Sequence, residues 1–106
     1  MNQRNNSYPM REWHVEHMQE TIIKYVTGIS DTMSLWQTRQ YLKYYDISNV
    51  QKTIYYDTRH GVTKEEVLLF IERVRNHPTY SALQSNDLAM EKLGKIEKYI
   101  YSENRI

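Results

Sequence analysis

The chain has 106 residues, with 14 lysines and arginines against 13 aspartates and glutamates, and it contains no cysteine. This length suits one domain with a modest core. The lack of cysteine excludes disulfides, thiolate metal sites and cysteine nucleophiles, and the nearly balanced charge argues against a protein whose main task is to neutralise nucleic-acid phosphates.

Residues 1–8 are polar and lack the apolar run of a signal peptide, so we expect a flexible segment there. The longest apolar run, from Val67 to Ile71, is far shorter than a membrane span. We therefore expect a cytoplasmic protein without membrane association, in which residues 9–106 form a single helical domain.

The first predicted helix covers residues 9–27. Pro9 suits a first helical turn, and the apolar residues after it recur every three or four positions: Val15, Met18, Ile22 and Val26. Gly28 then offers a left-handed cap. A second helix is predicted over about 33–45, where the apolar and aromatic residues are Leu35, Trp36, Tyr41, Leu42 and Tyr45.

Two tyrosine doublets, Tyr44-Tyr45 and Tyr55-Tyr56, lie 11 residues apart, and an aspartate follows each. On one uninterrupted helix the doublets would share a face, because 11 residues make about three turns. However, Ser48 with Gln51 fits a capping box, which predicts a break near 46–49 and a third helix over about 48–59, ending before His60 and Gly61. The break would place the doublets on different helices.

A fourth helix is predicted to begin at the capping box of Thr63 and Glu66 and to end by Pro78. Its apolar residues cover most of the circumference, which places this helix in the middle of a bundle. They are Val67, Leu68, Leu69, Phe70, Ile71 and Val74. A short turn through Ser81, Ala82 and Leu83 precedes a fifth helix over about 86–102, whose apolar stripe is Ala89, Leu93, Ile96 and Ile100.

These elements predict an all-α fold: a single-domain bundle of four to five short helices, built around the helix that begins at Thr63. The short connections permit several topologies. Whether the second and third helices are separate therefore rests on the predicted break alone.

Catalytic and cofactor motifs do not occur in the sequence. His14 and His17 lie three residues apart on one helix and could share a metal, but no H-E-x-x-H pattern or third ligand accompanies them. We interpret both as histidines in solvent or at the edge of the core. No nucleophile motif and no glycine-rich phosphate loop can be written either. We predict no catalytic residue, no cofactor and no metal, and hence a protein that is not an enzyme.

Residues 37–54 also permit a helix-turn-helix interpretation in which the third helix reads DNA. Bulky Tyr44 and Tyr45 at the joint and the charge of Asp57 weigh against it. The side chains that would contact bases or phosphates are Arg39, Lys43, Asn49, Gln51, Lys52 and Arg59.

Our main functional hypothesis is a small regulatory or adaptor protein that binds another protein through an aromatic surface. Tyrosine and tryptophan add contact area at little rotamer entropy, and both rings of a doublet cannot point inward from one helix face. The predicted anchors are Trp36, Tyr41, Tyr44, Tyr55 and Tyr56. The same surface would also serve a homodimer. Two alternatives stay open: DNA binding by the third helix, and purely structural tyrosines with the functional surface on the fifth helix or the N-terminus.

Overall fold

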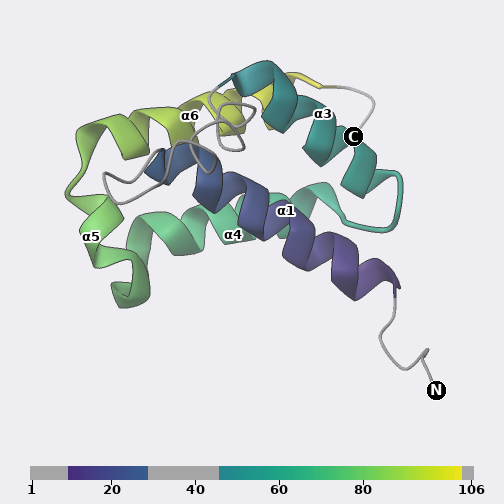
Figure 1. The fold of residues 1–106 in the computed structure, drawn as a ribbon, viewed down its shortest axis with the longest axis horizontal. Coiled ribbons are helices and arrows are strands. Elements are labelled where there is room, and N and C mark those ends of the chain that lie inside the picture. Colours follow the sequence, from purple (N-terminus) through teal and green to yellow (C-terminus); the bar gives the residue numbers. More distant parts are fainter. Residues whose placement is uncertain (1–9, 29–45, 104–106) are drawn as a thin grey trace, which may run out of the picture.

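The computed structural model describes residues 10–28 and 46–103, and over these residues the chain is helical, without strands. The all-α bundle predicted from the sequence is therefore confirmed. Figure 1 shows α1 crossing the molecule, α3 at one end, and the short α5 joining α4 to α6 at the other. The elements are α1 (Met10–Thr27), α3 (Ile47–Thr58), α4 (Lys64–Asn76), the 3-10 helix η2 (Pro78–Tyr80), α5 (Ser81–Gln84) and α6 (Asp87–Ser102).

Local capping fixes the helix ends. Gly28 adopts φ 72° directly after α1, which is the left-handed cap that the sequence predicts. Thr63 accepts a hydrogen bond from the backbone N–H of Glu66, whose carboxylate accepts one from Thr63 N–H, so the predicted capping box of α4 is confirmed. In α6, the side chain of Asn86 accepts from Ala89 N–H.

The predicted capping box of α3 is wrong. The N-cap is Asp46, whose side chain accepts a hydrogen bond from Ser48 N–H, and the helix begins at Ile47. Asp46 has extended backbone angles, φ −91° and ψ 121°. A helix cannot continue through such a residue, so the predicted break near 46–49 is confirmed at Asp46, and the first tyrosine doublet lies outside the described residues.

The core lies where α1, α3, α4 and α6 meet, and each helix contributes one apolar stripe. Met18 and Ile22 of α1 are fully buried. They share the interior with Val50 and Ile54 of α3, Val67, Ile71 and Val74 of α4, and Leu93, Ile96 and Ile100 of α6. No helix of this described part is long and apolar enough to cross a bilayer.

One expectation for α4 is wrong, because the helix is not surrounded by the core. Leu69 is 64% exposed and Leu68 is only partly buried, although both continue the apolar run of the sequence. The buried positions of α4 form one narrow stripe of Val67, Phe70, Ile71 and Val74. One side of α4 therefore keeps apolar surface in contact with water.

Acidification should weaken the contribution of Glu66 to stability. The hydrogen bond from Thr63 N–H, followed by the hydrogen bond and charge of Arg11, holds the pKa of Glu66 below its ordinary value of 4.5. A carboxyl whose folded-state pKa is depressed stabilises the fold above the unfolded-state pKa, and this stabilisation is lost as pH falls through the folded-state value. Wild type should therefore exceed Glu66→Gln in Tm at pH 7, and the difference should shrink below pH 4.5.

Thermal unfolding followed by circular dichroism across this pH range measures the difference. Glu65→Gln is the matched control, because Glu65 is the exposed neighbouring glutamate on the first turn of α4. A difference between wild type and Glu66→Gln that stays constant down to pH 3 would contradict the assignment.

Candidate functional site

A buried carboxylate joins α1 to α3. Asp57 is 0% exposed, and its Oδ1 lies 2.8 Å from Nδ1 of His14. Nδ1 of His17 lies 3.1 Å from Oδ1 and 3.0 Å from Oδ2 of the same carboxylate. One aspartate thus links two histidines that are one turn apart on the facing helix.

Helical periodicity brings these three residues together. His14 lies four residues before Met18 and extends the buried stripe of α1, and His17 lies beside it. Asp57 lies three residues after Ile54 and seven after Val50, so it occupies a core position of α3. Its backbone carbonyl also accepts hydrogen bonds from His60 N–H (3.0 Å) and Val62 N–H (3.2 Å), which close the end of α3.

The contacts with Asp57 assign the tautomers of the two histidines. A carboxylate oxygen accepts hydrogen bonds, so each histidine is assigned the tautomer that donates to Asp57 through Nδ1–H. Nε2 of His14 is buried and has no hydrogen-bond partner among the described residues.

Aromatic rings surround this carboxylate and reach the surface. Trp13 stacks on His17 with ring centroids 4.9 Å apart, and His14 stacks on His60 at 4.5 Å. Tyr56 lies 4.3 Å from His60 and 5.4 Å from His14. Trp13 and Tyr56 are 43% and 49% exposed. We call these five rings, Trp13, His14, His17, Tyr56 and His60, the aromatic cluster.

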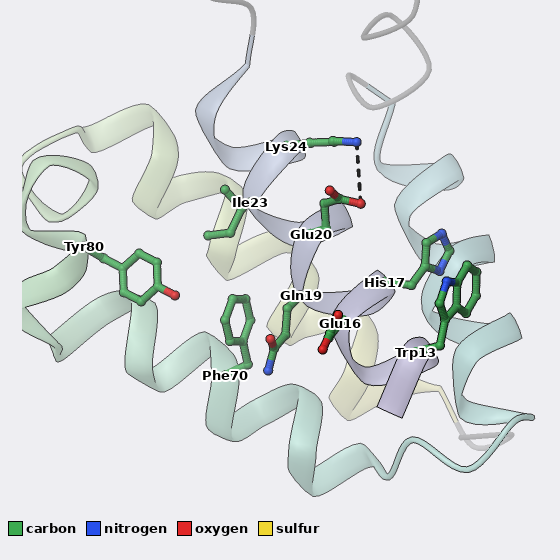
Figure 2. A pocket seen from close by; sticks show the side chains of 9 residues that line it. All are labelled: Trp13, Glu16, His17, Gln19, Glu20, Ile23, Lys24, Phe70 and Tyr80. Atoms are coloured by element: carbon green, nitrogen blue, oxygen red, sulfur yellow. Dashed lines mark ion pairs between the residues drawn. The ribbon is translucent and has the colours of Figure 1, made fainter. Parts of the chain in front are cut away.

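A shallow pocket of about 560 Å³ opens beside the aromatic cluster. Figure 2 shows Trp13 and His17 together on one side, and Phe70 and Tyr80 across from them. Between these aromatic ends, α1 contributes polar side chains, among which Lys24 pairs with Glu20 at 3.7 Å. The pocket thus has aromatic ends and a polar wall.

The second tyrosine doublet divides between two environments. Tyr56 projects into the aromatic cluster, whereas Tyr55 is partly buried, and its hydroxyl and ring both contact Arg59 of the next turn. Tyr25, in contrast, is a core residue, 2% exposed. The other predicted anchors, Trp36, Tyr41 and Tyr44, lie outside the described residues, as does the predicted helix 33–45.

The residues of the helix-turn-helix interpretation are only partly described. Lys52 of α3 and Arg59, the C-cap residue of α3, are exposed, whereas Asn49 and Gln51 are partly buried. The backbone carbonyl of Gln51 accepts a hydrogen bond from the hydroxyl of Tyr99 at 3.4 Å. Arg39 and Lys43 lie outside the described residues.

His14 and His17 do come together, but around a shared carboxylate. In residues 10–28 and 46–103, no three potential ligands gather in a metal-binding arrangement. The interpretation of both histidines as residues of the core edge or solvent is wrong for His14, which is 1% exposed. Its ring is buried because Asp57, Trp13, Tyr56 and His60 enclose it.

Sequence reasoning missed Asp57 and His60 as members of this site. A signal for Asp57 existed: a charged residue at a core position of the α3 stripe requires a buried partner. Nothing local identified that partner as the histidine pair of α1, 43 and 40 residues away in the sequence.

Comparison of this chain with protein-family models, with curated proteins and with solved structures finds no match.

Proposed function

We propose that the chain is a small, non-enzymatic regulatory or adaptor protein, which binds another protein through the exposed side of the aromatic cluster. The carrying observation is that two exposed rings, Trp13 and Tyr56, pack on histidines that share the buried carboxylate of Asp57. Trp13 contacts His14 and His17, and Tyr56 contacts His14. Large aromatic side chains at a surface are the commonest anchors of protein interfaces.

Rigid support favours binding at this surface. Trp13 is fixed by its stacking on His17, and Tyr56 by its contacts with His14 and His60. A side chain that is ordered before binding loses little conformational entropy in the complex. The neighbouring pocket, with Glu16, Gln19 and Glu20 on its wall, supplies the polar rim that surrounds such anchors.

The double substitution Trp13→Ala with Tyr56→Ala tests this proposal. The tagged wild-type chain captures partners from its native lysate after nuclease treatment, and the leading partner is then purified and titrated by calorimetry. Loss of two anchors should raise its Kd at least about tenfold, since truncation of a hot-spot residue costs about 2 kcal/mol or more. Circular dichroism verifies that the variant is folded.

Leu88→Ala is the control, because Leu88 is a large apolar residue of α6 that is 59% exposed and lies outside both the aromatic cluster and its pocket. A partner whose affinity is unchanged by the double substitution contradicts the proposal. Material that disappears with nuclease would instead favour DNA binding, for which Lys52→Glu is the corresponding variant. A homodimer through the cluster would appear in sedimentation of the wild type and be lost in the double variant.

A further inference from the structure

A second hollow lies between α4 and α6, on the side of α4 that faces away from the core. Its volume is about 610 Å³, and its apolar surface comes from Leu68, Leu69 and Tyr101. Leu69 and Tyr101 are 64% and 69% exposed, while Leu68 is anchored against the core. Two strongly exposed apolar side chains, one from each helix, thus line the same hollow. We call this hollow the α4–α6 groove.

The rim of the groove is acidic. Glu65, Glu72 and Glu97 line it together with Arg75, which reaches across from α4 to pair with Glu97. Glu65 and Glu72 have no ion-pair partner within the described ranges 10–28 and 46–103. The rim therefore keeps an excess of negative charge beside exposed apolar side chains.

The arrangement of these groups resembles one face of an amphipathic interface. Glu65, Leu68, Leu69 and Glu72 follow one another at i, i+3, i+4 and i+7 along α4. Two turns separate the carboxylates, which corresponds to about 10 Å along the helix axis. A helix laid alongside α4 would meet apolar side chains in the middle and a carboxylate at each end.

We propose that the α4–α6 groove binds a basic amphipathic helix of another protein. The apolar face of that helix packs on Leu68, Leu69 and Tyr101, and its lysines or arginines, spaced about two turns apart, pair with Glu65 and Glu72. A second copy of this chain is a poor occupant, because two acidic rims would face each other. Anionic nucleic acids and lipid surfaces are repelled for the same reason.

This proposal concerns residues that the aromatic cluster does not share, so the two proposals stand or fall separately. Phe70 of α4 borders the pocket beside the cluster, whereas Leu68 and Leu69 border the groove. A chain with both surfaces occupied would connect two partners, which is what an adaptor requires.

Titration of the full-length chain with a synthetic helical peptide tests the groove. The probe is an 18-residue leucine–lysine peptide with leucines at i, i+3, i+4 and i+7 and flanking lysines; the control peptide carries glutamates instead of lysines. Amide shifts in NMR spectra locate the peptide, and calorimetry gives its Kd. We expect shifts concentrated in 65–76 and 97–102, and no binding of the acidic peptide.

Two double variants examine the two parts of the groove. Each double variant should raise the Kd of the basic peptide at least about tenfold. The first is Glu65→Lys with Glu72→Lys, and the second is Leu69→Ala with Tyr101→Ala. Asp87→Lys with Glu91→Lys makes the same change in net charge at exposed positions of α6 outside the groove, and should leave the Kd within about twofold.

Three results would overturn the proposal. The first is an equal rise in the Kd of the basic peptide in the Asp87/Glu91 control variant, which would show that peptide binding responds to the overall charge of the chain alone. The second is absence of binding, or shifts located at Trp13 and His17. The third is concentration-dependent dimerisation that Leu69→Ala with Tyr101→Ala abolishes, which would make a second copy the occupant.

Discussion

Replacement of Asp57 with alanine is expected to lower the free energy of unfolding by about 3–5 kcal/mol. The substitution leaves the Nδ1–H donors of His14 and His17 without their shared acceptor, and His14 is almost completely buried. Stability of a small domain is about 5–15 kcal/mol in total, so the loss would be a large part of it. Urea unfolding followed by circular dichroism measures the change.

Asp57→Asn removes the negative charge of the side chain but keeps one oxygen that can accept hydrogen bonds. Its amide oxygen at the position of Oδ1 can still accept from His14, but its NH₂ group at the position of Oδ2 opposes the N–H of His17. The loss should therefore be smaller than for alanine. A double-mutant cycle between Asp57→Ala and His14→Ala should give a coupling of about 1–3 kcal/mol. Additive effects of the two substitutions would contradict a direct bond between the side chains.

The second large effect is expected in the core of α6. Leu93 is fully buried, and Leu93→Ala should cost about 2–5 kcal/mol, because the surrounding helices cannot close the cavity completely. Leu88 belongs to the same helix but is 59% exposed, so Leu88→Ala should change stability by less than about 0.5 kcal/mol. Parallel urea titrations compare these identical substitutions.

If Leu93→Ala lowered the free energy of unfolding as little as Leu88→Ala does, the result would contradict the burial of Leu93 in the core. The m-value should stay unchanged in both variants if each still unfolds in one cooperative step. A reduced m-value would instead indicate that α6 unfolds separately from α1, α3 and α4.

The two proposed surfaces differ in how they are built. The aromatic cluster depends on a buried polar centre, so the Asp57 variants should disturb both folding and binding at Trp13 and Tyr56. The α4–α6 groove consists of side chains on two helices whose inner faces are apolar. Substitutions at its outer positions should alter binding with little effect on stability.

The sequence by itself determined the helices of the described region. The predicted ranges 9–27, 48–59 and 86–102 differ by one residue at most from α1, α3 and α6 at each end. This agreement has a local cause, since caps and apolar periodicity depend on residues within about one turn of one another. The same local reasoning misplaced the cap of α3, because Asp46 and Ser48 are both competent N-cap residues.

Only the tertiary structure decided which polar residues became the candidate site. The local pattern pairs His14 with His17 and places the charge of Asp57 at a core position, but the meeting of all three depends on how α1 crosses α3. The exposure of Leu69 likewise follows from which side of α4 the other helices cover. The angle at which two helices cross is set by the packing of their whole faces. At this site the residues that meet are 40 or more positions apart in the sequence. The periodicity of one helix carries no information about the helix it packs on.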